Sequence, residues 1–392
     1  MNKKNKIPYG NHYIDNNDIL LVNKSLKSEL LTGGYYNEKF TTELKKYLGT
    51  KYVTLCSSGT SALHLAFLSI NLESNDIIIM PAINFVASYN MAKNLGAKIF
   101  LADVDKNTGQ MTTKNVEDCI KKNNLKKIKC ILNMFLGGSP ENIEKFYKLK
   151  KKYNCFLIED SCHAFGSKYE YKNNIYKVGS NFHSDISTFS FHPVKSIATG
   201  EGGCLTTRSK KIYERSMILR NHGLKKNKKK HWDYDVIENG YNYRLDDISA
   251  ALGLSQLKKI NKFIGKRNKI VKLYKKELKE IFDFIKFPNY SKKIFNCYHL
   301  LIVNIDFKKL NTSKDFFLSY MLKNNITCQY HYKPIYKFKI YNKSIKSVKD
   351  FPNSEIYYKN SLSLPIFYKL KTDDIFHITN KIKNFIKNKA NY

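Results

Sequence analysis

Residues 51–70 read KYVTLCSSGTSALHLAFLSI, and the two halves of this stretch follow different patterns. The first half, KYVTLCSS, is a short run of apolar and β-branched residues that is typical of a strand. The second half, TSALHLAFLSI, is an apolar run of helical length. The stretch therefore predicts a buried strand that leads through a polar turn into a helix.

The same alternation continues to about residue 210. DIIIM (76–80) has the pattern of a strand, and ASYNMAKNLGA (87–97) has that of a helix. Further short apolar runs, each bounded by polar or turn residues, are AKIFLADV (97–104), IKCILNMF (128–135), CFLIED (155–160), STFSFH (187–192) and GGCLTT (202–207). Such runs fit strands that are buried on both faces. The alternation favours an α/β domain with a mainly parallel sheet, whose ligands bind at the carboxyl ends of the strands.

The pattern changes after Arg244. Residues 245–281 carry Leu and Ile at helical spacing, which predicts one long helix. CYHLLIVNI (297–305) and ITCQYHYKPIY (326–336) then read as strands, with helices around them. We therefore expect a large ligand-binding domain with an N-terminal arm at residues 1–254. A smaller α+β domain is expected at residues 255–392, joined to the first by the long helix.

The formal net charge of +35 allows two interpretations. A polyanion-binding protein, such as a nucleic-acid binder, carries an excess of basic residues, and this is the non-enzymatic alternative. Here, however, Lys, Asn, Ile and Tyr are all abundant and Arg is scarce, as expected from an AT-rich genome. The lysines are spread along the chain, with one cluster at residues 225–231, and a nucleic-acid binder is expected to use Arg. We expect no nucleic-acid partner, although the charge can attract a diphosphate substrate.

Cysteine spacing and hydropathy narrow the class of protein further. None of the eight cysteines forms a C-x-x-C pair, which favours reduced, mostly buried thiols, and we expect no metal site. No run of 18 apolar residues is present, and MNKKNKIPYG at the start lacks the apolar core of a secretory signal. The sequence predicts a cytoplasmic protein with no membrane-spanning segment.

Two predicted strand ends carry polar residues that admit a structural and a chemical interpretation. The turn at residues 57–61, which includes Gly59 and Thr60, opens a helix and is either an ordinary Ser/Thr cap or an anion site. Asp160 ends the strand CFLIED, where it either caps a following helix or pairs with a cationic nitrogen of a ligand. His163 faces roughly the same way if that next turn is helical.

A third strand end lies in TFSFHPVKSIATGEGGCLTT, residues 188–207. Ser190, His192 and Lys195 leave a buried strand at the same edge of the sheet. A lysine in a dry site has a lowered pKa and can act as an amine nucleophile. The three strand ends together offer a phosphate site, a carboxylate for a ring nitrogen and an amine for an aldehyde. Pyridoxal 5′-phosphate requires these three features.

The order of the motifs makes a family resemblance specific. Over nearly its whole length the chain resembles the sugar-nucleotide aminotransferases of the DegT–StrS type, which are fold-type I pyridoxal phosphate enzymes. The motifs that carry the resemblance are SSGTSALHLA, PAINFVASYNMAKNLGA, IEDSCHAFG, FSFHPVKSIATGEGG, RNHG and GYNYRLDDISAALGLSQL. IPYGNHYIDNNDI, LLTGG and QYHYKPIY most resemble the aminotransferases of pseudaminic acid synthesis. Those enzymes aminate C4 of a UDP-linked 2-acetamido-2,6-dideoxy-4-keto-hexose with glutamate as donor.

The resemblance also implies roles for individual residues. It makes Lys195 the lysine of the Schiff base, pairs Asp160 with the pyridine nitrogen and puts His163 near the ring hydroxyl. It implies a stacking contact from Phe85 and phosphate contacts from Gly59, Thr60 and Ser190. Asn242 reaches the same phosphate from the neighbouring subunit of a homodimer with shared active sites. The segments that resemble substrate contacts contain Tyr9, Leu31, Thr32, Gly33, Gly34, Tyr330, His331, Tyr332 and Lys333.

Two positions depart from the common pattern of the family. Cys162 stands where Ala or Ser is usual, and FLGGSPENIE (135–144) lacks an aromatic residue that many relatives carry. One alternative is amino transfer to another nucleotide-linked 3- or 4-keto sugar, of the bacillosamine or legionaminic type. Another is sugar dehydration, since one subgroup of this fold has replaced the lysine by His. Lys195 is present here, so amino transfer is favoured.

Overall fold

The computed structural model describes residues 6–227, 229–230, 232–341 and 348–390. Within these residues the largest sheet has seven strands, in the order β1 (Tyr52–Cys56), β9 (Gly203–Thr207), β8 (Ile186–Ser190), β5 (Phe156–Asp160), β4 (Cys130–Met134), β2 (Ile77–Pro81) and β3 (Lys98–Ala102). Neighbours from β8 to β3 pair in parallel, whereas β9 is antiparallel to both β1 and β8. The predicted α/β fold with a mainly parallel sheet is confirmed. β9 is the exception because residues 191–202 join it to β8 without a crossover helix.

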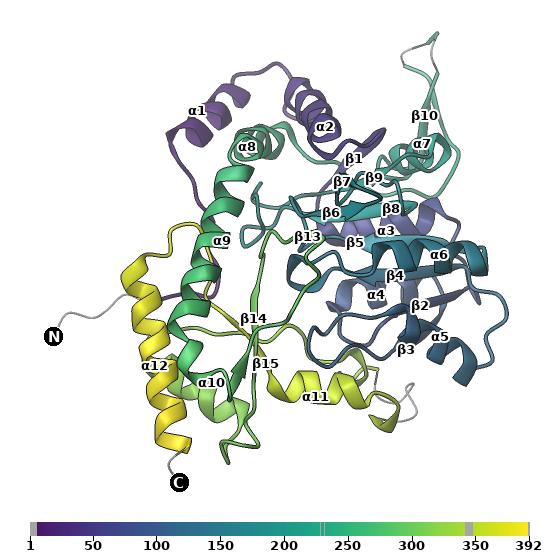
Figure 1. Cartoon of the computed structure of the whole chain (residues 1–392). Coiled ribbons are helices and arrows are strands. Elements are labelled where there is room, and N and C mark those ends of the chain that lie inside the picture. Colours follow the sequence, from purple (N-terminus) through teal and green to yellow (C-terminus); the bar gives the residue numbers. More distant parts are fainter. Residues whose placement is uncertain (1–5, 228, 231, 342–347, 391–392) are drawn as a thin grey trace.

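Helices cover both faces of this sheet (Figure 1). One face packs against α3 (Gly59–Ser69), α4 (Val86–Asn94) and α7 (Lys210–Leu219). The other packs against α2 (Tyr35–Leu48), α5 (Thr113–Lys122), α6 (Ile143–Tyr153) and α8 (Asp247–Lys258). Leu132 and Ile131 of β4 belong to the cores on opposite faces, and both are fully buried. Apolar side chains of a central strand are therefore buried on both of its faces.

A second hydrophobic core is built by the C-terminal part of the chain (Figure 1). Its elements are α9 (Ile260–Glu277), α10 (Lys314–Lys323), α12 (Thr372–Ala390) and an antiparallel sheet of β12 (Ile285–Lys286), β14 (Leu301–Ile305) and β15 (Ser361–Leu364). Tyr274 and Phe317 are wholly buried within it. The division of the chain at residues 254 and 255 stays a prediction.

Further elements lie at the edges of the two cores. These are α1 (Asn16–Ser25), α11 (Pro352–Asn360), β6 (Lys168–Tyr171), β7 (Asn174–Lys177), β10 (Leu224–Lys226), β11 (Tyr234–Val236) and β13 (Ile294–Phe295). β10 and β11 pair as an antiparallel hairpin that extends away from the sheet, at the upper right of Figure 1. Of the basic cluster at residues 225–231, residues 228 and 231 lie outside the described residues.

The expectation of one long helix over residues 245–281 is wrong. α8 and α9 meet at Lys259, whose φ of −99° and ψ of −3° separate them. The cause lies in packing, because Leu254 of α8 belongs to the core beneath α2 and Tyr274 of α9 belongs to the C-terminal core. One straight helix directs its apolar stripe to one side and cannot serve both cores.

The expected strand at residues 326–336 is also absent from the described structure. Isolated bridges pair Ile326 with Ile7 and Gln329 with Ser363. His331 Nδ1 lies 2.9 Å from the Ser363 hydroxyl, and Tyr357 donates a hydrogen bond to the His331 carbonyl at 2.9 Å. Isolated backbone bridges and side-chain bonds therefore hold this segment in place of a continuous strand ladder, and its aromatic residues line a cavity.

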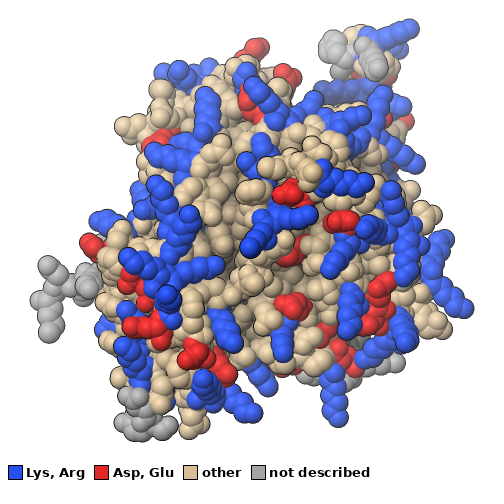
Figure 2. All heavy atoms as spheres, in the orientation of Figure 1, with Lys and Arg blue, Asp and Glu red and all other residues tan. Residues whose placement is uncertain are grey.

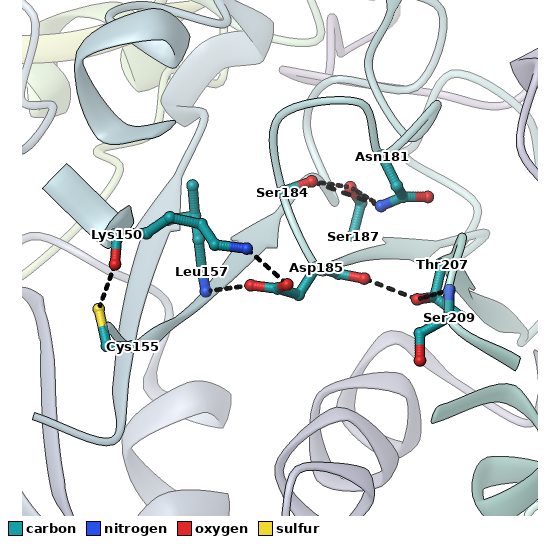
Figure 3. A network of polar contacts seen from close by, with 9 residues as sticks. All are labelled: Lys150, Cys155, Leu157, Asn181, Ser184, Asp185, Ser187, Thr207 and Ser209. Carbon is teal, nitrogen blue, oxygen red and sulfur yellow. Dashed lines mark hydrogen bonds and ion pairs between the residues drawn. The ribbon is translucent and has the colours of Figure 1, made fainter. Parts of the chain in front are cut away.

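Polar contacts around Asp185 tie together the strands that lead to that cavity (Figure 3). The Asp185 carboxylate accepts hydrogen bonds from Leu157 N–H in β5 at 2.8 Å and from Lys150 Nζ in α6 at 2.6 Å. Its carbonyl accepts one from the Thr207 hydroxyl in β9 at 2.7 Å. Asp185 itself precedes β8. The network thus joins β5, β8 and β9 near the ends opposite to the carboxyl ends of β5 and β8.

The visible face in Figure 2 carries Lys and Arg across its whole area, with Asp and Glu between them. The positive charge on that face is therefore dispersed and does not form one patch. Within the described residues, we find no helix whose length and apolar character suffice for a membrane span.

Candidate active site

A cavity of about 670 Å³ lies where β2, β4, β5 and β8 end. Most of the residues singled out from the sequence line it, although they are distant along the chain. These are Tyr9, Gly59, Thr60, Phe85, Asp160, His163, Ser190, Lys195, Tyr330, His331, Tyr332 and Lys333. The location agrees with the rule that α/β sheets bind ligands at the carboxyl ends of their strands.

Lys195 lies in the turn between β8 and β9. The turn is held by a backbone hydrogen bond from Lys195 N–H to the His192 carbonyl at 2.8 Å and by another from Thr199 N–H to the Phe191 carbonyl at 2.9 Å. Burial lowers the pKa of the Lys195 ammonium, and the nearby Cys162 and Asp160 oppose that shift. A lowered pKa increases the fraction of free amine, which is the form that attacks an aldehyde.

Asp160 is the last residue of β5, and only 2% of its surface is exposed. Its Oδ1 accepts a hydrogen bond from Cys162 N–H at 3.2 Å. Residues 161–167 form turns and no helix, so the helix-cap interpretation is wrong. Burial raises the pKa of the Asp160 carboxyl, opposed by the hydrogen bonds from Cys162 and by the charge of Lys195. A buried carboxylate of this kind is stabilised by a cationic partner such as a protonated ring nitrogen.

The N-terminus of α3 faces the same cavity. The Ser58 hydroxyl accepts from Ser61 N–H at 3.0 Å in a capping box, so the Ser/Thr cap is real. The cap leaves Gly59 N–H and Thr60 N–H without a hydrogen-bond acceptor among the described residues, and such groups bind anions. A Cβ at Gly59 would lie 2.7 Å from the Ser190 Cβ, so the close approach of these two strand ends requires glycine.

His163 and Phe85 complete the wall around Asp160. The Nε2 atom of His163 lies 2.9 Å from the Tyr332 hydroxyl, and its ring centroid lies 4.4 Å from that of His299. Burial, Lys195 and His331 hold the pKa of His163 well below its ordinary value, so the ring is neutral. Phe85 precedes α4 and is half exposed toward the cavity, with its ring 5.6 Å from that of Tyr332.

These residues fit pyridoxal 5′-phosphate. The free N–H groups of α3 and the Ser190 hydroxyl suit its phosphate, and the buried Asp160 suits its ring nitrogen. The partly buried Lys195 suits its aldehyde. Among the described residues, no group of three or more His, Cys, Asp or Glu side chains is arranged to hold a metal ion.

Leu31–Gly34 and Asn242 lie outside this cavity in their own chain. The first segment packs on the start of α8, where Asp247 N–H donates to the Leu31 carbonyl at 2.8 Å and Gly34 N–H donates to Asp247 Oδ2 at 2.9 Å. Asn242 is exposed and forms an isolated bridge with Asn221. The roles assigned to these residues remain predictions.

The structure adds residues that the sequence did not single out for this site. Asn84, Met134, Gln329 and Phe338 also line the cavity. Asn84 is the one that sequence reasoning could have found, because it directly precedes Phe85 in PAINF and is 1% exposed. His299 gave no signal, since its place beside His163 depends on packing of the second core against the first.

Comparisons with known proteins agree with this geometry. Residues 12–383 match the model of the DegT/DnrJ/EryC1/StrS aminotransferase family. The chain is 37% identical to the UDP-4-amino-4,6-dideoxy-N-acetyl-beta-L-altrosamine transaminase of Campylobacter jejuni, over 96% of this chain and 98% of that one. It is 32% identical to the GDP-perosamine synthase of Escherichia coli O157:H7, over 94% of this chain and 95% of that one.

A solved structure gives the same assignment. Helicobacter pylori PseC, an aminotransferase involved in the biosynthesis of pseudoaminic acid, superposes with a TM-score of 0.88 at 29% identity. The match covers 98% of this chain and all of that one. Together with the site geometry, these matches lead to one conclusion. The chain belongs to the DegT/DnrJ/EryC1/StrS aminotransferase family and is an aminotransferase that depends on pyridoxal 5′-phosphate.

Proposed function

We propose that this enzyme transfers an amino group from glutamate to the C4 ketone of a UDP-linked 2-acetamido-2,6-dideoxy-4-keto-hexose. The observation that carries the proposal is the convergence of Lys195, Asp160 and the free end of α3 on one cavity. The choice of sugar is supported by the C. jejuni and H. pylori relatives, one a transaminase of UDP-4-amino-4,6-dideoxy-N-acetyl-beta-L-altrosamine and the other an aminotransferase of pseudoaminic acid biosynthesis.

Each residue of the site has a physical role in this proposal. The bound cofactor supplies an aldehyde for amines and a protonated ring that withdraws electrons. Lys195 would provide the amine that holds the aldehyde, and its free amine would be the base that accepts and returns a proton at this place in the cavity. Asp160 keeps the ring nitrogen protonated because its negative charge is buried beside it. Gly59, Thr60 and Ser190 would hold the phosphate, and Phe85 and His163 would border the ring.

Tyr9 and residues 330–333 are proposed to contact the sugar nucleotide. This role is supported by their position, because they form one wall of the cavity. The N-terminal segment and the chain near the second core contribute that wall. Tyr9 lies with its ring 5.7 Å from that of His331, and Lys333 brings a cation that suits a diphosphate. We propose a cytoplasmic location, supported by eight cysteines that are all free.

A homodimer with shared active sites is part of the proposal. Asn242 is exposed, and its neighbour Tyr243 accepts a hydrogen bond at its carbonyl from Ser57 N–H at 2.9 Å. α1 and the segment after it expose apolar side chains that a second copy of the chain can cover. These are Ile19, Leu20, Leu26, Leu30 and Leu31.

The substrate is tested with a panel of nucleotide-linked keto sugars and glutamate as donor. GDP-linked sugars belong in the panel beside UDP- and dTDP-linked ones, because one relative is a GDP-perosamine synthase. Product mass separates the reactions, since amino transfer replaces the ketone oxygen by an amine and dehydration removes water. If a GDP-linked, bacillosamine-type or legionaminic-type sugar is converted faster than the proposed one, the choice of substrate is wrong.

The role of Lys195 is tested by borohydride reduction of the cofactor-loaded enzyme followed by peptide mapping. We expect the adduct on Lys195. Lys314 is a suitable internal control, because burial lowers its pKa to about 8, as burial also lowers that of Lys195, but it lies outside the cavity. An adduct on Lys314 or another lysine contradicts the assignment.

A further inference from the structure

Two segments far apart in the chain place hydrogen-bonding groups on either side of His163. Gly137 N–H donates to His163 Nδ1 at 3.4 Å, and the Tyr332 hydroxyl lies 2.9 Å from His163 Nε2. His163 itself is 1% exposed. Gly137 has a φ of +74°, a backbone conformation that favours glycine and that turns its N–H toward the imidazole.

The backbone donor determines which imidazole nitrogen carries the proton. An N–H group cannot donate to a nitrogen that already bears a hydrogen, so Nδ1 of His163 is the bare nitrogen. Because the ring is neutral, its proton is on Nε2. Nε2–H therefore donates to the Tyr332 oxygen, and the hydroxyl keeps its own proton for another acceptor. Among the described residues, no second hydrogen-bond partner of this hydroxyl is found.

Tyr332 lines the cavity and is held firmly there. Its ring packs against the buried cluster that includes Met134 and Tyr357, and the preceding His331 is bonded to Ser363 and Tyr357. The ionisable groups near Tyr332 are His163, His331, Asp160, Cys162, Tyr9 and Tyr357, of which the last four raise the pKa of its hydroxyl. With burial, these four hold the pKa of its hydroxyl well above the ordinary value, so the hydroxyl remains a donor.

We propose that Tyr332 donates a hydrogen bond to the ring oxygen of the bound cofactor and that His163 is the positioning residue that directs it there. The cofactor is favoured over the sugar as acceptor because Tyr332 is next to Phe85, Asp160 and His163, the residues that border the ring. The inference rests on the proposed cofactor roles of Lys195 and Asp160. It goes beyond them in assigning the Tyr332 hydroxyl to the cofactor and not to the sugar nucleotide, which leaves Tyr9, Tyr330, His331 and Lys333 as the proposed sugar-nucleotide contacts.

The first test replaces the tyrosine by phenylalanine, which removes the hydroxyl and keeps the ring. A hydrogen bond to an ionised oxygen favours the ionised form. In Tyr332→Phe we therefore expect the pH midpoint of the visible absorbance of the loaded enzyme to rise by about one to two pH units. The matched control is Tyr274→Phe, which removes a buried hydroxyl that bonds to the Pro365 carbonyl and lies outside the cavity. Its midpoint should equal that of the wild type.

The second test examines the cofactor-free protein by ¹⁵N NMR of labelled histidines. The His163 signals, assigned by their loss in His163→Gln, should show a bare Nδ1 and a protonated Nε2. A proton on Nδ1 overturns the inference, because Nε2 would then accept the tyrosine proton. This measurement needs no change at Tyr332, so it stays decisive if Tyr332→Phe does not fold.

The outcomes separate this inference from the proposed function. If borohydride marks Lys195 and the midpoint of Tyr332→Phe equals that of the wild type, the inference is wrong and the proposed function stands. Suppose that Tyr332→Phe keeps the wild-type midpoint and slows only the amination of the keto sugar. The hydroxyl then binds the sugar, and the inference is again wrong. If the wild type forms no adduct at Lys195, both are wrong.

Discussion

Asp160 and Glu159 are neighbours in β5, and the alternation of the strand sends their carboxyl groups to opposite faces of the sheet. Burial raises the pKa of both, but their surroundings differ. Asp160 faces the cavity, whereas Glu159 accepts a hydrogen bond from the Ser187 hydroxyl at 2.7 Å. The same strand therefore carries one carboxyl suited to a cationic ligand and one buried in the protein interior.

Asp160→Asn is expected to lower the turnover of the glutamate half-reaction by at least about a hundredfold, which corresponds to roughly 2.7 kcal/mol of barrier. The amide keeps the shape of the side chain but loses the negative charge. Because burial raises the pKa of Asp160, its ionised form costs stability once the pH exceeds the ordinary range of an aspartate. Calorimetry of the cofactor-free variant at pH 7.5 should therefore show an unfolding temperature no lower than that of the wild type. If more than about a tenth of the turnover remains, the charge has little catalytic role.

Glu159→Gln is expected to stabilise the protein at pH 8 and to have little effect at pH 5. Burial raises the pKa of Glu159 from 4.5 to about 7, so the native state binds a proton that the unfolded state releases. Stability from this group is therefore present below pH 4.5 and is lost as the pH rises through 7, by on the order of 3 kcal/mol. Urea unfolding at both pH values measures the difference. If Glu159→Gln changes the free energy of unfolding equally at pH 5 and pH 8, the raised pKa of Glu159 is contradicted.

At the scale of elements, the start of α3 serves both the fold and the ligand. Gly59→Ala adds a Cβ that would lie 2.7 Å from the Ser190 Cβ, and one of the two strand ends must shift. We expect the Kd of the cofactor to rise at least about tenfold, or about 1.4 kcal/mol. Gly265→Ala in α9 is the control, since nothing lies within 4 Å of its added Cβ. It should leave the Kd unchanged and add about 0.5–1 kcal/mol of stability. Equal Kd values for both variants and the wild type contradict the role of Gly59.

The network of Figure 3 links β5, β8 and β9, and Asp185 is its centre. Asp185→Asn loses the ion pair with Lys150 and weakens the bond from Leu157 N–H. We expect the free energy of unfolding to fall by about 1–3 kcal/mol in urea titrations. Glu117→Gln, which removes the exposed pair with Lys152, is the control and should cause no measurable change. Similar losses in both variants show that the network has no special role.

At the scale of the whole molecule, the proposed shared site can be tested by mixing two inactive variants. A heterodimer is formed from one Lys195→Ala subunit and one Asn242→Asp subunit. If the site is shared, both substitutions fall in one of its two sites and the other site is intact. Aspartate is chosen because it sets a negative charge against the phosphate. Random mixing gives about half heterodimers, each with one whole site, so roughly a quarter of wild-type activity should return.

Subunit exchange must be shown separately, for example by mass spectrometry of differently tagged copies. The Asn242→Asp homodimer must also be inactive. If exchange occurs and no activity returns, Asn242 acts within its own chain and the shared site is wrong.

The sequence by itself determined the order of elements and the principal residues of the site. The strands β1, β2, β3, β4, β5, β8 and β9 all lie where short apolar runs indicated them. Such runs reflect local burial on both faces in the central strands, whereas β3 at the sheet edge is only partly buried. Asp160 ends β5, Gly59 opens the helix after β1 and Lys195 lies in the turn after β8, and parallel strands end at the same edge of a sheet. Local sequence and one topological rule were therefore sufficient to bring them together.

The tertiary structure alone decided the features that depend on packing between distant segments. The break at Lys259 arises because α8 and α9 serve different cores, although their residues share one helical pattern. Residues 326–336 lose their strand because side chains of the second core hold them over the cavity. His163 and Tyr332 are 169 positions apart, so their contact has no local signal. Such contacts depend on how the two cores pack against each other, and the hydrophobic periodicity of a single segment does not predict that packing.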